Sequence, residues 1–66
     1  MHKLYNATDS IGCFKTFLIA NQPVILVGTV EVIKLQMAAE LPAILVHSIL
    51  EIVKRTSSEG ENVKFI

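Results

Sequence analysis

The chain has 66 residues, with six Lys and Arg residues against six Asp and Glu residues, and 52% of its residues are hydrophobic. This length limits it to one small domain spanning residues 1–66. The formal net charge of zero excludes the strong positive field by which many nucleic-acid-binding domains attract phosphates. A chain this short buries only about 60% of its unfolded surface on folding, so its hydrophobic residues exceed what one core can hold.

Small domains are commonly stabilised by disulfides, by a structural metal or by oligomerisation. With one cysteine, two histidines and no paired ligand spacing such as C-x-x-C, the sequence gives no basis for a disulfide or a metal site. We therefore predict no metal and no cofactor. Oligomerisation is left as the expected source of stability, either as a homo-oligomer or as a subunit of a larger protein assembly.

The N-terminal residues lack the uninterrupted apolar stretch of a secretory signal peptide, which predicts a cytoplasmic location. The longest run without charges, residues 16–30, contains Asn21, Gln22, Pro23 and Gly28. A helix that spans a membrane needs about 20 predominantly apolar residues. We therefore do not expect the chain to cross a membrane.

Residues 2–6 are a short strand candidate, and a helix is predicted to follow. Thr8, Asp9 and Ser10 can each accept hydrogen bonds from the free N–H groups at the start of a helix. Apolar residues then recur on one helical face up to Leu18. Pro23 ends the helix, because proline disfavours helical geometry in the residue before it and cannot extend the hydrogen-bond ladder.

Two β-rich runs, residues 24–27 and 30–33, are separated by Gly28 and Thr29. Glycine at the first central position is typical of a type II′ turn between two antiparallel strands, so we predict a hairpin. The alternative is one long strand over residues 24–35 with a bulge at Gly28. In either case the alternation makes residues 24–27 apolar on both faces of the sheet, which predicts that both faces are covered.

A second helix is predicted from Pro42 to about Thr56, followed by an exit loop over residues 56–60 and a strand over residues 63–66. On this helix His47, Glu51 and Lys54 share a narrow polar stripe, while apolar residues occupy most of the remaining circumference. A helix of this kind needs covering on two sides. We expect another subunit to supply the second cover, through Val46, Ile49, Leu50 and Val53, with His47 and Glu51 at the rim.

The predicted order of strand, helix, hairpin, helix and strand resembles the ferredoxin-like βαββαβ arrangement, in which two helices cover one face of an antiparallel sheet. Members of that family that carry metals have a C-x-x-C motif before the first helix, whereas Cys13 stands alone. Members that bind RNA carry paired aromatics on the two central strands. Here only Tyr5 and Phe65 are candidate strand aromatics.

A second resemblance concerns residues 30–34 followed by residues 41–54. This stretch is similar to the second strand and second helix of Alba-type nucleic-acid-binding proteins, and it implies an alternative βαβαβ fold. It covers less than half of the chain and lacks the basic loop with which that family holds phosphates. The resemblance implies nucleic-acid binding, with Lys34, Lys54 and Arg55 as the candidate phosphate contacts.

Cys13 with His47 as its base is a candidate nucleophilic site, and an ordinary buried cysteine is the alternative. No third residue is evident that would orient the histidine, so the sequence favours the buried cysteine, and we predict no enzyme activity. The leading hypothesis is a small non-catalytic, homo-oligomeric interaction module with a regulatory or structural role. The alternatives are an Alba-like nucleic-acid-binding protein and a small-ligand sensor in which the sheet faces of a dimer enclose a pocket.

Overall fold

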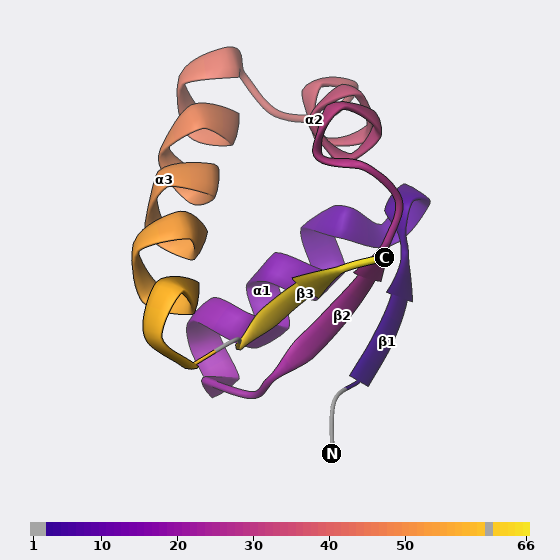
Figure 1. Cartoon of the computed structure of the whole chain (residues 1–66). Coiled ribbons are helices and arrows are strands. Elements are labelled where there is room, and N and C mark those ends of the chain that lie inside the picture. Colours follow the sequence, from indigo (N-terminus) through magenta and orange to yellow (C-terminus); the bar gives the residue numbers. More distant parts are fainter. Residues whose placement is uncertain (1–2, 61) are drawn as a thin grey trace.

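Strands and helices alternate along the chain, and the three strands lie parallel in one sheet (Figure 1). The computed structural model describes residues 3–60 and 62–66, with side chains over residues 3–55 and 62–66. The sheet order is β1-β2-β3. The elements are β1 (Lys3–Asn6), a 3₁₀ turn (Ala7–Asp9), α1 (Ser10–Ala20), β2 (Val24–Val27), α2 (Val30–Ala38), α3 (Ala43–Gly60) and β3 (Val63–Phe65).

The first predicted strand and helix are confirmed as β1 and α1, although His2 lies outside the described residues. The start of α1 differs from the predicted cap, because no side chain caps it and a 3₁₀ turn leads into it. Its end is marked by Asn21 in the left-handed conformation, a common helix C-terminus. The hydroxyl groups of Tyr5 and Thr16, 2.8 Å apart, share a hydrogen bond that ties β1 to α1.

The predicted hairpin is wrong, and so is the bulged strand over residues 24–35, because residues 30–38 form α2. Thr29 is the N-cap of this helix: its side-chain hydroxyl accepts a hydrogen bond from the backbone N–H of Val32 at 3.3 Å. Gly28 has φ of +139°, which lets the chain turn out of β2 into the cap. Ile33 and Met37, spaced i, i+4, then place one buried helical face against the core.

This change of one element overturns both predicted folds. Antiparallel strands can be joined by a two-residue turn, whereas parallel strands need a long crossover connection. Here α2 and α3 form that crossover between β2 and β3, so β3 runs parallel to β2. The sheet is therefore neither the antiparallel ferredoxin-like sheet nor the Alba-like βαβαβ arrangement. A small α+β domain with three parallel strands is formed instead.

The last two predicted elements are present with altered limits. The helix predicted from Pro42 to about Thr56 is α3, which continues to Gly60. Residues 56–60 are therefore the end of a helix and not the predicted exit loop. The C-terminal strand is confirmed as β3. The hydrogen bond from the Ile66 N–H to the Leu26 carbonyl continues its pairing with β2.

All buried hydrophobic side chains among the described residues lie in one cluster, which leaves the other face of the sheet bare. Strand residues paired side by side point to the same face, so Val24 and Val63 face the helices together. The opposite face carries the apolar residues Leu4, Ile25, Val27 and Ile66, together with Asn6 beside Val27 and Lys64 beside Ile25. We call the four apolar residues the bare face. Figure 1 shows α1 behind the sheet and no described element in front of it.

We expect Thr29→Ala to lower the free energy of unfolding by about 1 kcal/mol, because it removes the oxygen that caps α2. Thr29→Ser keeps that oxygen and is the matched control, expected within a few tenths of a kcal/mol of the parent. Urea unfolding followed by circular dichroism measures both values. Equal stability of Thr29→Ala and the parent chain would contradict the assignment of Thr29 as the N-cap.

Candidate functional site

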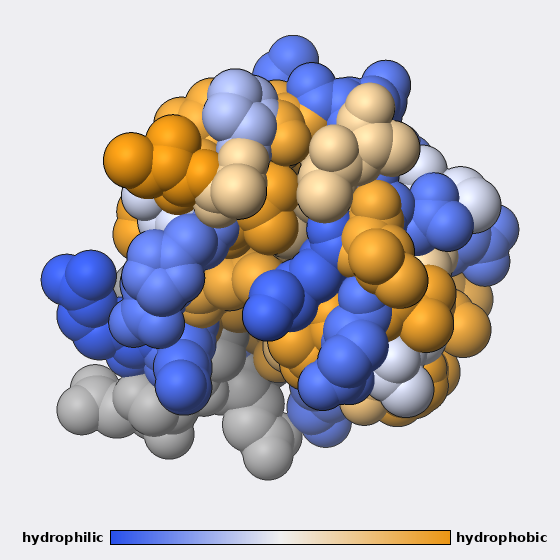
Figure 2. Space-filling view, turned by 90° about the horizontal axis from the view of Figure 1, so that it is seen from above, coloured by the Kyte–Doolittle hydropathy of each residue, from blue (hydrophilic) through white to orange (hydrophobic). Residues whose placement is uncertain are grey.

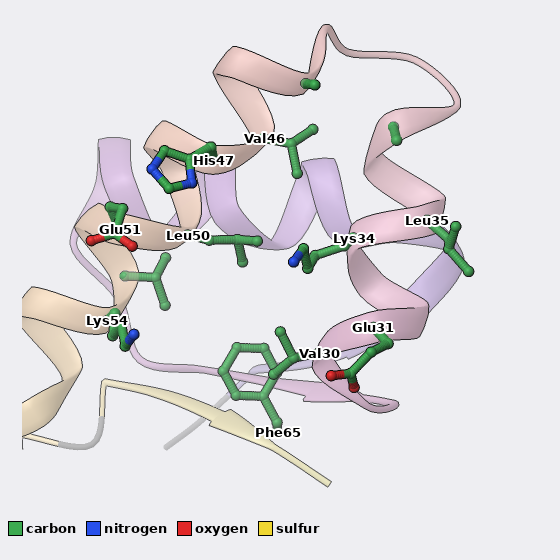
Figure 3. A pocket seen from close by; sticks show the side chains of 13 residues that line it. Val30, Glu31, Lys34, Leu35, Val46, His47, Leu50, Glu51, Lys54 and Phe65 are labelled. Atoms are coloured by element: carbon green, nitrogen blue, oxygen red, sulfur yellow. The ribbon is translucent and has the colours of Figure 1, made fainter.

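A groove of about 890 Å³ lies between α2, α3 and the end of β3 (Figure 3). Its lining is mostly apolar. The apolar residues are Val30, Leu35 and Ala38 from α2, Ala43, Val46, Leu50 and Val53 from α3, and Phe65 from β3. The groove borders the sheet at the carboxyl end of the strands, since α2 begins there and Phe65 is the last residue of β3. This is the edge at which parallel sheets commonly place their binding sites.

The rims of the groove carry charges of both signs. On α2 these are Glu31 and Lys34; on α3 they are Glu51 and Lys54, with His47 one turn before Glu51. All five side chains are exposed. Figure 3 shows Glu31 and Lys54 near the end of the groove closest to Phe65, with Lys34 and Glu51 farther along it. Residues of opposite charge therefore occupy corresponding levels on the two rims.

Five of the six residues predicted for the interface line this groove, but they differ in exposure. Val46 and Val53 are 5% and 3% exposed and belong to the core, so their main contacts are within the chain. Leu50 is half-buried, whereas His47 and Glu51 are exposed at the rim.

Ile49, the sixth predicted residue, packs half-buried against the core outside the groove lining. The apolar surface of α3 faces both the core and the groove, and its covering by another subunit stays a prediction.

The α2 wall of the groove was missed because residues 30–33 were predicted as a strand. Leu35, the most exposed of the large hydrophobic residues in the lining at 72%, lies on this wall. The i, i+4 spacing of Ile33 and Met37, together with a threonine at the cap position, was the signal that could have identified it.

The three candidate phosphate contacts lie near one another, but they do not form a purely basic surface. Lys34 and Lys54 line the groove, and Arg55 follows Lys54 on α3. Glu31 and Glu51 line the same groove. Lys34 also lies on a helix, not on the strand implied by the Alba-type resemblance. The surface is thus of mixed sign, unlike the basic stripe typical of phosphate binding.

Cys13 and His47 are not brought together as a nucleophile and its base. Cys13 is fully buried in the core, whereas the His47 side chain is exposed at the groove rim. Burial, with a smaller contribution from the Asp9 carboxylate, raises the pKa of the Cys13 thiol to about 11. The thiol is therefore kept neutral, which is the weakly nucleophilic form.

Within the described parts of the chain, no three His, Cys, Asp or Glu side chains are grouped so as to hold a metal ion. No described helix combines the length and the apolar character needed to cross a bilayer. Figure 2, which looks onto α2 and the start of α3, shows hydrophobic atoms exposed among hydrophilic side chains.

Comparison of the chain with protein-family models, with curated proteins and with solved structures gives no match.

The buried thiol makes stability depend on pH at the alkaline end. Because the pKa of Cys13 is about 11 in the folded chain and 9.0 as the unperturbed value, its contribution is complete below pH 9. The contribution is lost as the pH rises from 9 towards 11. We expect urea unfolding to show a steeper loss of stability over this window for the parent chain than for Cys13→Ala. Parallel pH curves for the two proteins would contradict the burial of the thiol.

Proposed function

We propose that the chain is a non-catalytic association module that forms a homo-oligomer. The observation that carries this proposal is the bare face of the sheet. Leu4 and Ile66 are 62% and 69% exposed there, and Val27 is 38% exposed. Parallel sheets are almost always covered on both faces, because the crossover helices or other layers bury their apolar side chains. In this chain the described helices cover one face only.

Burying this surface is favourable by about 25 cal/mol for each Å² of apolar area removed from water. The chain has exposed large hydrophobic side chains on its helices as well, including Leu35 on α2 and Ile44 on α3. No described element of the chain covers them. Association offers the cover that the fold itself does not supply.

A second copy of the chain is the partner proposed here. The formal net charge of zero removes the long-range repulsion that identical charged molecules exert on one another. Closed symmetric assemblies are also the commonest form of soluble oligomer. Association with a different protein, as one subunit of a larger assembly, is the alternative that the measurement below separates from it.

Light scattering over a concentration series should give a mass above the 7.3 kDa of one chain. Leu4→Lys should shift the midpoint of association to at least tenfold higher concentration, because it places a charge on the bare face. The control is Ile19→Lys, which introduces the same charge on α1 at a residue 75% exposed. Its association curve should match that of the parent chain.

A monomer at every concentration, with the circular dichroism of a folded chain, would overturn homo-association and leave a different protein as the partner. Equal curves for Leu4→Lys and the parent chain would show that the bare face takes no part in the assembly. Thermal melting at low concentration checks that each variant remains folded.

A further inference from the structure

The charges on the groove rims are complementary to those of a second copy, an inference that rests on the proposed homo-association. We infer that the groove between α2 and α3 forms a two-fold interface. In this interface Lys34 lies opposite Glu51 of the second copy, and Glu31 lies opposite Lys54 of the second copy. The occupant of the groove face is thus another molecule of the same chain.

The two walls of the groove run in opposite directions. The residues of α2 run from Glu31 near Phe65 to Leu35 farther along the groove, while those of α3 run from Val46 to Lys54 in the opposite sense (Figure 3). The two rims therefore read in opposite orders. Starting from the sheet, α2 shows an acidic and then a basic residue, and α3 shows a basic and then an acidic residue.

A two-fold axis can relate two copies of the chain across this groove. A two-fold axis in the plane of the interface and parallel to the helices places α2 of one copy over α3 of the other at the same level. Glu31 then meets Lys54 of the second copy, and Lys34 meets Glu51 of the second copy. Each pair occurs twice, because a two-fold interface uses the same patch on both copies. Four contacts of opposite charge result, and no contact of like charge is formed.

These charges have no other ion-pair partner in the described part of the chain. The side chains of Glu31, Lys34, Glu51 and Lys54 are exposed and form no ion pair with a described residue. Forming the intermolecular pairs therefore breaks none of the described contacts. Between the rims the groove offers the apolar side chains of Val30 and Leu50 for burial, and Leu35 lies on the outer side of α2. An apolar centre with a charged rim is the usual composition of a protein interface.

The area of the bare face can be compared with the area that a stable dimer buries. Strands of three or four residues in a sheet of three present a face of roughly 14 Å by 13 Å, or about 180 Å² in projection. A stable dimer needs about 800 Å² of accessible surface on each partner. The bare face alone is thus too small. Phe65 of the groove and Ile66 of the bare face point to opposite sides of the sheet, so the groove offers a second, separate surface for association.

The experiment is a charge exchange read by light scattering and sedimentation. Lys34→Glu alone and Glu51→Lys alone each replace two attractive contacts by two repulsive ones. We expect each to weaken dimerisation about tenfold or more at low salt, with a smaller effect at 1 M salt. The double variant Lys34→Glu/Glu51→Lys restores opposite charges across the interface and should return the dimer constant to within about threefold of the parent value.

Lys15→Glu, an exposed residue of α1 outside the groove lining, is the matched control for a lysine reversal and should leave dimerisation unchanged. Dimerisation of both single variants at the parent constant would overturn the groove interface while leaving homo-association intact. Failure of the double variant to recover, with normal melting of the dilute chain, would overturn the pairing of Lys34 with Glu51. A parent chain that stays monomeric would overturn the proposed function itself.

Discussion

The turn from β2 into α2 is the constraint on which the rest of the structure depends. Gly28 adopts a positive φ, its N–H donates to the carbonyl of Ile66, and Thr29 caps the following helix. This geometry directs the chain away from the sheet and not back along it. Every later feature follows from that direction, including the crossover through α2 and α3 and the parallel pairing of β3. The side chain of Ala7 lies close behind, since a Cβ at Gly28 would be 3.2 Å from its Cβ.

A parallel sheet is usually covered on both faces, whereas the described helices cover one face of this sheet. Each pair of parallel strands requires a crossover, and the described helices all contribute to the covering of one face. An antiparallel sheet would tolerate one solvated face with polar residues on it. Here Asn6 and Lys64 are polar, but the central strand β2 carries the apolar residues Ile25 and Val27 on that side. The excess of hydrophobic residues over core capacity, evident from composition, therefore has a definite location on this sheet and in the adjoining groove.

Much of the fold was predictable from local chemistry. Pro23 limits α1, Pro42 precedes α3, and the β-branched residues of β2 predict a strand. The failure at residues 30–33 has a physical cause: Val30, Val32 and Ile33 favour a strand intrinsically, while the buried pair Ile33 and Met37 favours a helix only once the core exists. Tertiary packing decided between them. Sheet direction was thereby misassigned, although the other strands and helices were placed nearly correctly.

The candidate site was predictable in part for the same reason. The residues of α3 that line the groove were identified from the helical wheel, because α3 was placed correctly. The opposing wall depends on α2, which the sequence analysis did not predict. The place of Leu35 in the groove lining and the position of Lys34 across from Glu51 could therefore not be predicted. The apparent excess of apolar residues on α3 is explained once both walls are present. Val46 and Val53 serve the core, and Leu50 lies between the core and the groove.

Within the groove, the apolar side chains and the rim charges contribute differently to association: the former to its affinity and the latter to its selectivity. Exposed ion pairs contribute little to affinity, typically below about 1 kcal/mol each, so burial of apolar surface has to supply most of the free energy of association. The rim charges act on orientation instead, because only an arrangement that opposes acidic to basic residues avoids repulsion. In a chain of zero net charge no overall field favours or opposes the approach of a second copy. The local pattern of charges along α2 and α3 then disfavours those arrangements of two copies that bring like charges together.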